Sequence, residues 1–393
     1  MHFFASKNVS SPFLWTKPYQ VQKGPFLGIL LPLFKENRDR LTEALHNFSE
    51  KYQCTWGGPL PHIGAMSGSF FCTVEAKNIE HEMVFEVCLE WEMGSLWLTD
   101  QPTWYRHRKI ASRMFSTNLL REGSKVTLKK VKELSALLNV ASSTGQEVDF
   151  QDFFFRMTLD ITCVLSFGLE YGSLQNKTQH PFTLAFNEMQ QLLVERITDP
   201  LFELKRFFNV TKREKRIGEL KVILDEHAKE IIQGRRRTAE DGKLGPDILS
   251  RFIDYATKHN EDVKRGNGVC GRIDGDNDGD YSFNTIQKLQ YMDAIVMEVL
   301  RFHPSVPVTL KYAINDDVLP DGTFIPKGAM MALPPFDVGR SCQVWGSDAG
   351  EFKPTRFLNQ KNQTASKYST FHAGKSFCLG KPMALNTMKL TLA

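Results

Sequence analysis

The stretch that most constrains this chain is FHAGKSFCLG, which occupies residues 371–380. Gly374 allows a tight turn, and Gly380 has no side chain that would keep the backbone away from a flat ligand. The residues that follow, 379–392, favour a helix. Cys378 therefore lies just before a helix N-terminus, where free amide groups and the positive end of the helix dipole favour a thiolate.

A thiolate in this position is a metal ligand or a nucleophile. Phe371 would shield the sulfur, which favours an axial haem ligand. A lone cysteine is usually only a small buried hydrophobic residue, and this interpretation holds for the other six cysteines. A phosphate-binding P-loop is excluded, although Gly374, Lys375 and Ser376 resemble its end. Ser369 stands where that motif requires a glycine, and no apolar strand precedes it.

Composition limits the class of protein. The chain has 393 residues, of which 41% are hydrophobic and 29 are phenylalanine, so it can bury a large core. A net charge of +4 is too mild to indicate a nucleic-acid partner. The seven cysteines form no CxxC pair and are typical of reduced intracellular thiols. The apolar run at residues 25–34 is too short to cross a bilayer and contains two prolines.

With this cysteine loop the chain resembles the cytochrome P450 family of haem-thiolate monooxygenases, whose pattern is F-x-x-G-x-x-x-C-x-G. The resemblance implies a mainly helical fold with small β-sheets, in a single domain over residues 1–393. It also implies that Cys378 is the axial ligand of the haem iron, with Phe371, Gly374 and Gly380 shaping the cradle around it.

Further residues resemble the haem-propionate contacts of that family. Trp104 and Arg108 are four apart at the start of a predicted helix that runs to about residue 115, so they share a face. Alone, this pair would be interpreted as a surface cation beside a half-buried tryptophan. Beside the cysteine loop, it is predicted to hold a propionate, for which a planar cation and an indole N–H are suited. Lys311 and Lys375 are predicted as further propionate contacts.

A structural triad is also implied. Residues 284–303 predict one amphipathic helix, which carries Glu298 and Arg301 among apolar neighbours. An ion pair enclosed in this way needs another partner. The resemblance assigns that role to Arg356, in the segment Pro-Thr-Arg-Phe. Further helices are predicted at 151–168 and 211–237, and strands at 308–314 and 323–333.

Departures from the family are expected. Ser376 stands two before the cysteine, where the family usually has an arginine or histidine for a propionate, with Lys375 beside it as a substitute. An acidic, glycine-rich loop at residues 260–282 takes the place of the long oxygen-activating helix, so no catalytic residue is identified. Residues 1–24 form a tail without a membrane anchor, and the sequence ends before the C-terminal sheet of the family. The aspartates of the loop resemble half of a calcium-binding EF-hand, but Thr285 stands where that motif needs a glutamate.

The resemblance implies insertion of one oxygen atom into a C–H bond. Residues 301–307 and 317–326 are similar to the plant and fungal branch that hydroxylates long-chain fatty acids or alkanes at the ω-position. The implied cofactors are haem b and NADPH, with a separate NADPH–cytochrome P450 reductase as partner and molecular oxygen as co-substrate; no nucleic acid is expected. The implied location is the cytosolic face of the endoplasmic reticulum membrane, although the missing anchor leaves a cytoplasmic location open.

Two other hypotheses belong to different classes. The missing oxygen-activating helix is compatible with a haem-binding protein or scaffold that does not catalyse substrate oxidation. The half EF-hand is compatible with a calcium-responsive binding protein, which is the weaker alternative.

Overall fold

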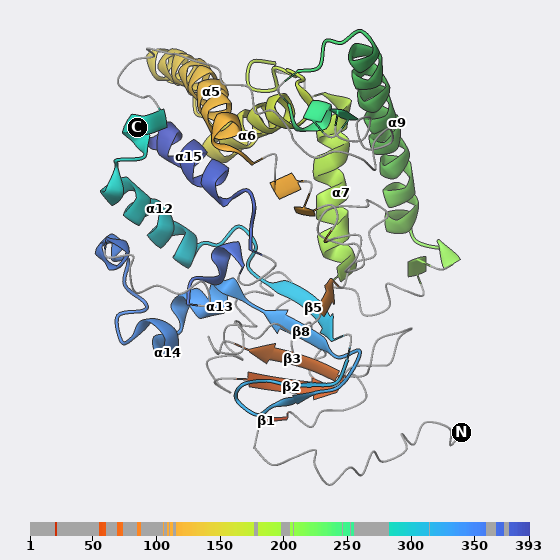
Figure 1. Ribbon diagram of the computed structural model, residues 1–393, viewed down its shortest axis with the longest axis vertical. Coiled ribbons are helices and arrows are strands. Elements are labelled where there is room, and N and C mark those ends of the chain that lie inside the picture. Colours follow the sequence, from red (N-terminus) through yellow and green to blue (C-terminus); the bar gives the residue numbers. More distant parts are fainter. Residues whose placement is uncertain are drawn as a thin grey trace, which may run out of the picture. The chain divides into compact units, whose positions relative to one another are not determined.

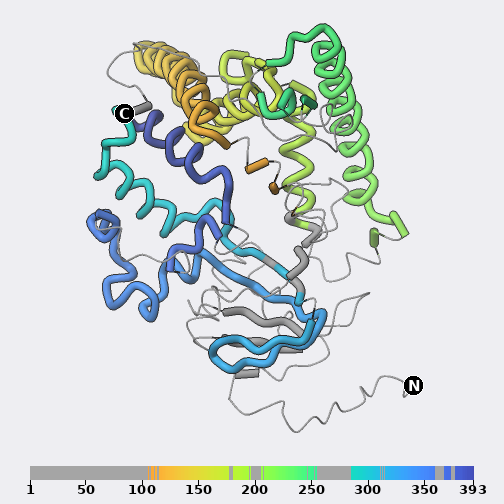
Figure 2. Tube along the Cα trace, in the orientation of Figure 1, coloured from red at the N-terminus to blue at the C-terminus, as the bar shows by residue number. Residues whose placement is uncertain are grey.

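The computed structural model groups the described residues into two compact units, which are treated separately below (Figures 1 and 2). Unit 1 consists of Met1–Arg108 and Asp293–Cys378, and unit 2 consists of Lys109–Met292 and Leu379–Ala393. The structure describes residues 20–21, 55–59, 69–73, 85–87, 105, 108–109, 111–112, 115–176, 180–197, 205–206, 208–245, 247–251, 253–254, 283–313, 315–358, 367–372 and 377–393.

Unit 1 contains a mixed six-stranded sheet with the order β1-β2-β3-β8-β5-β4. Strand pairs β2–β3, β5–β8 and β4–β5 are antiparallel, whereas β1–β2 and β3–β8 are parallel. The strands are β1 (Gln20–Val21), β2 (Thr55–Pro59), β3 (Ser69–Thr73), β4 (Phe85–Val87), β5 (Thr309–Ala313) and β8 (Met330–Leu333). Their central pairs join residues far apart in sequence, such as Phe71 of β3 with Met331 of β8.

The predicted strand at 323–333 is corrected by the structure, because it is two strands in two sheets. β7 (Phe324–Ile325) pairs with β6 (Asp317–Val318) in a separate two-stranded sheet, and β8 joins the large sheet. Between them Gly328 has φ 77°, which favours glycine, and the chain turns. The side chain of Asp316 accepts from the Lys327 N–H at 2.7 Å and stabilises this turn.

In the chain, the helices of unit 1 lie before and after strands β5 and β8. They are the C-terminal part of α12 (Gln290–Phe302), α13 (Pro335–Arg340), α14 (Cys342–Trp345) and the 3₁₀ turns η1 (Pro354–Phe357) and η3 (Ser369–Phe371). A small core of Ala313, Leu319, Ile325, Ala329 and Met331 lies between the two sheets and their connections.

Unit 2 is helical in the part that the structure describes. Its helices are α5 (Thr117–Thr144), α6 (Phe150–Phe167), α7 (Pro181–Ile197), α9 (Lys212–Glu240), α11 (Phe283–Ile286) and α15 (Lys381–Leu392). Local sequence sets their ends. Asp149 and Thr211 accept hydrogen bonds from the first turns of α6 and α9, and Gly145 and Gly168 end α5 and α6 in the left-handed conformation. The predictions at 151–168 and 211–237 match α6 and α9 to within three residues.

The core of unit 2 lies where α5 packs against α6 and α15 (Figure 1). Its buried side chains are Leu134, Met157, Ile161, Leu165 and Leu174, and Met383 of α15 packs against them. Separately, α7 and α9 run side by side, and Arg216 binds Glu188 through two hydrogen bonds of 2.7 Å.

The single helix predicted at 284–303 is wrong, because α11 ends at Ile286 and α12 begins at Gln290. In a continuous helix the carbonyl of Ile286 would accept from the N–H of Gln290. Here it accepts from the Leu289 N–H and from Nζ of Lys389, both at 3.2 Å, and the Gln290 N–H donates to the Lys288 carbonyl at 2.9 Å. A local turn and a buried lysine from α15 therefore meet where the helix is interrupted.

The fold class predicted from the sequence is confirmed: the chain is mainly helical with small β-sheets. Within the described residues, no helix combines the length and the apolar character that crossing a bilayer requires.

Candidate functional site

Cys378 is half-buried and lies three residues before α15 begins in the chain. Its N–H donates to the carbonyl of Phe371 at 2.9 Å, which closes the loop between the two residues. The Phe371 side chain is buried, and Gly380 is the N-cap of α15. Residues 373–376 of this loop, which include the predicted Gly374 and Lys375, lie outside the described residues.

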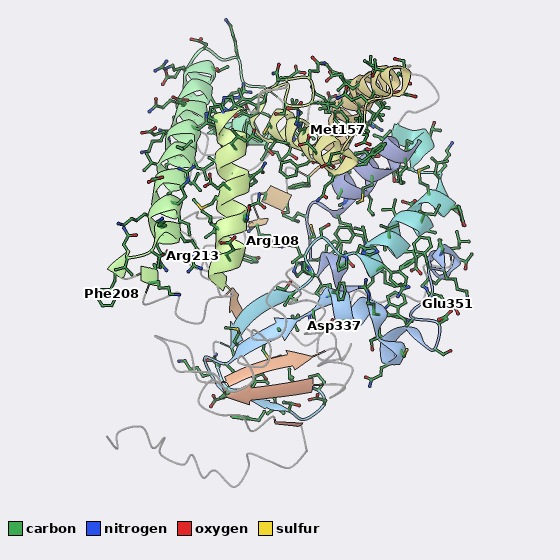
Figure 3. All side chains as sticks on the ribbon, turned by 180° about the vertical axis from the view of Figure 1, so that it is seen from behind. Arg108, Met157, Phe208, Arg213, Asp337 and Glu351 are labelled. Atoms are coloured by element: carbon green, nitrogen blue, oxygen red, sulfur yellow. The ribbon has the colours of Figure 1, made fainter. Side chains whose placement is uncertain are left out.

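Arg108, which is labelled in Figure 3, donates from its guanidinium to the carbonyl of Phe377 in this loop. Burial lowers the pKa of Arg108, and the charge of Cys378 acts in the opposite direction. A cation is therefore held next to the cysteine. Trp104, the predicted companion of Arg108, lies outside the described residues.

Lys311 lies on β5 in the same unit, and burial lowers the pKa of its ammonium group. Its neighbour is His372, a residue that the sequence did not single out. The pKa of His372 is lowered to about 4 by burial and by the charge of Lys311. The structure therefore places a neutral imidazole beside Lys311.

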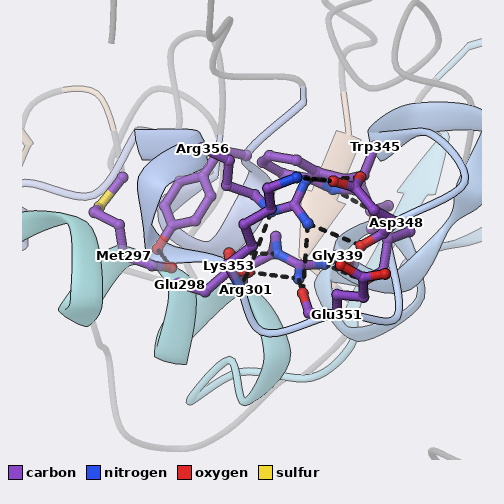
Figure 4. Close-up of polar contacts among 12 residues, drawn as sticks. Met297, Glu298, Arg301, Gly339, Trp345, Asp348, Glu351, Lys353 and Arg356 are labelled. Atoms are coloured by element: carbon purple, nitrogen blue, oxygen red, sulfur yellow. Dashed lines mark hydrogen bonds and ion pairs between the residues drawn. The ribbon is translucent and has the colours of Figure 1, made fainter. Parts of the chain in front are cut away.

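Glu298, Arg301 and Arg356 lie together in the interior of unit 1 (Figure 4). Arg301 holds the carboxylate of Glu298 through Nε to Oε2 at 2.7 Å and through Nη2 to Oε1 at 2.9 Å. Arg356 donates from Nε to Oε1 at 3.1 Å, and the main-chain N–H of Lys353 donates to the same oxygen at 2.7 Å. Burial alone would raise the pKa of Glu298, but these hydrogen bonds and charges outweigh it and lower the pKa.

The guanidinium of Arg301 is fully used. A guanidinium has five N–H groups. Two of them bind Glu298, and the other three donate to the carbonyl groups of Gly339, of Ala349 at 2.8 Å and of Glu351 at 3.0 Å. One side chain on α12 therefore fixes three points of the following chain, which sequence reasoning missed because main-chain carbonyls have no residue signature.

Arg356 binds a second carboxylate at the edge of this network. It donates from Nη1 to Oδ1 of Asp348 at 3.1 Å, and Lys353 donates from Nζ to Oδ2 at 3.0 Å. The hydrogen bonds from Lys353 and Arg356 lower the pKa of Asp348 to about 2. Asp348 thus keeps its negative charge and helps to orient Arg356.

The last turns of α12 connect the triad with the cysteine loop. Tyr368 donates from its hydroxyl to the carbonyl of Met297 at 3.1 Å, and Thr370 donates to the carbonyl of Leu300 at 3.2 Å. The Leu300 carbonyl lies in the last turn of α12, where intrahelical donors run out. The residues that precede Phe371 are therefore anchored on the helix that carries Glu298 and Arg301.

Aromatic rings extend the same connection. Successive ring centroids lie 5.7, 5.4 and 6.3 Å apart in a row formed by Trp345, Phe357, Tyr368 and Phe371. The guanidinium of Arg301 lies 5.2 Å from the Trp345 ring. This row packs the triad and the cysteine loop into one structure within unit 1.

The side chains around Cys378 fit an iron porphyrin. The half-buried thiol of Cys378 suits a metal ion, and the cation of Arg108 beside it suits a carboxylate group. Lys311, elsewhere in unit 1, is a second cation suited to a carboxylate. The acidic interval 260–282, including the aspartates of the half EF-hand, lies outside the described residues.

Comparison with known proteins supplies a family. The sequence profile of the cytochrome P450 family matches residues 22–267 and 272–393. Cytochrome P450 704B1 of Arabidopsis thaliana is 28% identical over 485 aligned positions, which cover 100% of this chain and 90% of the relative. Cytochrome P450 94B1 of the same plant is 29% identical, covering 75% of this chain and 67% of the relative, and cytochrome P450 86B1 is 26% identical, covering 94% and 78%.

Two features of these matches concern the interior of the chain. The family match is interrupted at residues 268–271, inside the acidic interval. The alignment with cytochrome P450 704B1 spans 485 positions, whereas this chain has 393 residues. The relative therefore contains segments within the aligned region that have no counterpart here.

Proposed function

Because this chain belongs to the cytochrome P450 family, we propose that it is a haem-thiolate monooxygenase that inserts one oxygen atom into a C–H bond. Membership implies a haem, electrons from a redox partner, molecular oxygen and a lipophilic substrate. The observation that carries the proposal is the position of Cys378. It is half-buried, its loop is closed onto Phe371, and Arg108 lies beside it.

Cys378 is the proposed axial ligand of the haem iron, and a haem bound there supplies activation of molecular oxygen. Phe371 and Gly380 shape the loop on the sulfur side, together with Gly374. Arg108 and Lys311 are the proposed propionate contacts, joined by Trp104 and Lys375. This assignment is supported by the cationic character of the two described residues and by their burial.

Glu298, Arg301 and Arg356 are proposed to be structural. They do not meet the substrate or the oxygen, but they hold the segment that precedes Phe371 through α12 and the main chain around Gly339. This role is supported by the complete burial of Glu298 and by the use of every Arg301 N–H.

The finer assignments follow the resemblance of residues 301–307 and 317–326. The proposed substrate is a long-chain fatty acid hydroxylated at the ω-position, the haem is haem b, and electrons come from NADPH through NADPH–cytochrome P450 reductase. The proposed location is the cytosolic face of the endoplasmic reticulum membrane. We further propose one cytochrome P450 domain over residues 1–393, which is supported by a family match that runs through both units.

A spectrum tests the central assignment. The reduced carbon monoxide complex of the full chain should show the red-shifted Soret band of thiolate ligation. Cys378→Ala should lose this band, whereas Cys342→Ala, which removes an exposed thiol from the same unit, should keep it. Retention of the band in Cys378→Ala would falsify the ligand assignment.

A second candidate is a haem-binding protein without turnover. It is favoured by the interruption of the family match at residues 268–271 and by the segments of cytochrome P450 704B1 that this chain lacks. The test is NADPH consumption together with product analysis, with a reductase and a long-chain fatty acid present. Hydroxylated product in proportion to the NADPH consumed supports the monooxygenase. NADPH consumption that yields only peroxide or superoxide from oxygen supports this second candidate.

A further inference from the structure

Two hydroxyl groups just before the cysteine loop donate to carbonyl groups of α12. Tyr368 is buried and donates to the carbonyl of Met297 at 3.1 Å, and Thr370 donates to the carbonyl of Leu300 at 3.2 Å. Met297 and Leu300 are three residues apart and therefore lie on one face of the helix. The two hydroxyls thus hold one segment of unit 1 against one face of α12.

The carbonyl of Leu300 needs a donor from outside the helix. In a continuing α-helix it would accept from the N–H of the residue four positions later. That residue is Pro304, which has no N–H. Leu300 is buried, and a buried carbonyl group without a donor is costly. Because the Thr370 hydroxyl supplies a donor, its contact with α12 answers a requirement of the helix end.

The phenol of Tyr368 is held as a neutral donor. Burial raises its pKa and outweighs the hydroxyl of Thr370, which acts in the opposite direction. The Tyr368 ring also lies in the aromatic row, with ring centroids 5.4 Å from Phe357 and 6.3 Å from Phe371. Ring packing and a hydrogen bond therefore fix the same side chain.

A short main-chain path leads from these hydroxyls to the cysteine. Phe371 follows Thr370 directly, and its carbonyl accepts from the Cys378 N–H at 2.9 Å. All of these residues belong to unit 1. A shift of Thr370 away from α12 would therefore move Phe371 and, through this hydrogen bond, Cys378.

We propose that Tyr368 and Thr370 are positioning residues for the thiolate of Cys378. The proposal rests on the proposed function, in which this sulfur ligates the haem iron. A metal–thiolate bond requires the sulfur at a fixed place, and loss of a residue that orients a metal ligand typically changes metal affinity by roughly 10–100-fold. The two hydroxyls do not meet the iron or the substrate; they act through α12 and Phe371.

The first test uses the haem-loaded full chain with Tyr368→Phe, Thr370→Val and both changes together. Each change removes a hydroxyl and nearly keeps the shape of the side chain. The carbon monoxide complex should lose part of the red-shifted Soret band, most of all in the double variant, and haem should pass to apomyoglobin roughly tenfold faster. Tyr105→Phe and Thr355→Val, at exposed positions of the same unit, are the matched controls and should behave as wild type.

The second test needs no haem. The haem-free chain is treated with iodoacetamide, and alkylation of each cysteine is followed by mass spectrometry. A half-buried thiol in a fixed loop reacts slowly, so Cys378 should react faster in the double variant than in the wild type. Cys342 is already exposed and should keep its rate. Cys163 is buried in unit 2 and reacts only if the fold opens more widely.

The positioning role requires both effects, faster haem loss and faster alkylation confined to Cys378. It is overturned if the double variant keeps the wild-type value of either rate. It is also overturned if Cys163 gains reactivity in parallel with Cys378, because the hydroxyls would then stabilise the whole fold. The carbon monoxide spectrum of Cys378→Ala tests the ligand assignment by itself, and the alkylation rates do not depend on haem, so failure of the proposed function is recognised separately.

Discussion

A Cβ atom on Gly339 would lie 2.2 Å from the carbonyl oxygen of Arg301 and 3.2 Å from its carbonyl carbon. The two residues also meet in the opposite sense, because the Arg301 side chain donates to the Gly339 carbonyl. The backbones of α12 and α13 therefore approach each other at a point where only glycine fits. The buried guanidinium of Arg301 depends on this approach for one of its acceptors.

Gly339→Ala should destabilise unit 1 for this reason. The added methyl group meets main-chain atoms, so a backbone must move, and overpacking of this kind typically costs about 1–3 kcal/mol. We expect a lower urea midpoint and a smaller fraction of haem-loaded chain. Gly350→Ala is the control, since its Cβ would meet nothing within 4 Å. Equal midpoints for the two variants would show that α12 and α13 tolerate separation.

Glu298→Gln should destabilise unit 1 more than Gly339→Ala does. The carboxylate accepts from Arg301, Arg356 and the Lys353 N–H, and an amide would turn a donor toward one of these donors. Removing one partner from a buried charge network typically costs ~3–5 kcal/mol. Urea denaturation should show this loss, accompanied by haem-free or aggregated protein. Glu351→Gln, which changes an exposed carboxylate nearby, should behave as wild type. A stable, haem-loaded Glu298→Gln variant would contradict the structural role.

Arg301→Lys tests whether a positive charge alone is enough to hold Glu298 and the main chain around Gly339. An ammonium group has three N–H donors on one nitrogen, whereas Arg301 uses five N–H groups spread over a planar fork. We therefore expect Arg301→Lys to leave carbonyls of the segment around Gly339 without donors and to lose haem to a similar extent as Glu298→Gln. Arg121→Lys, on an exposed position of α5, is the matched control. Full haem content in Arg301→Lys would mean that the positive charge, and not the fork, is what Glu298 requires.

The sequence predicted those parts of the site that depend on residue type. Glu298 and Arg301 lie three residues apart in an apolar helix, so a buried pair of this kind needs a further partner. Arg356, which follows the predicted strands in the sequence, was predicted to be that partner. The sequence did not predict the close approach of Gly339 to the Arg301 main chain or the hydrogen bond from the Lys353 N–H to Glu298. Contacts made through the main chain leave no pattern of residue types. The break after Ile286 was equally invisible, since it depends on Lys389, a residue 103 positions away.

Two ion pairs of unit 2 should differ in their contribution to stability. Asp160 is completely buried, accepts from the N–H groups of Ser173 at 2.9 Å and Leu174 at 3.2 Å, and lies 3.6 Å from Nζ of Lys130. Asp160→Asn leaves a buried lysine with less negative charge and should lower the free energy of unfolding by about 3 kcal/mol. Glu188→Gln breaks a bidentate pair that is well exposed to solvent and should leave the melting temperature nearly unchanged. A similar effect of both variants would contradict the role assigned to burial.

The stability of the haem-free chain should depend on pH through His372. Its pKa in the folded chain is about 4, below the ordinary value of 6.5, so the unfolded chain binds the proton first as the pH falls. This contribution to stability is present above pH 6.5 and is lost as the pH falls toward 4, at about 1.4 kcal/mol per pH unit. His372→Asn lacks this proton, so its free energy of unfolding should fall less between pH 7 and pH 5, by roughly 2 kcal/mol. Carboxylates such as Glu298 and Asp348 titrate in both proteins and cancel in the difference. Parallel pH profiles for His372→Asn and the wild type would mean that the imidazole is not held neutral beside Lys311.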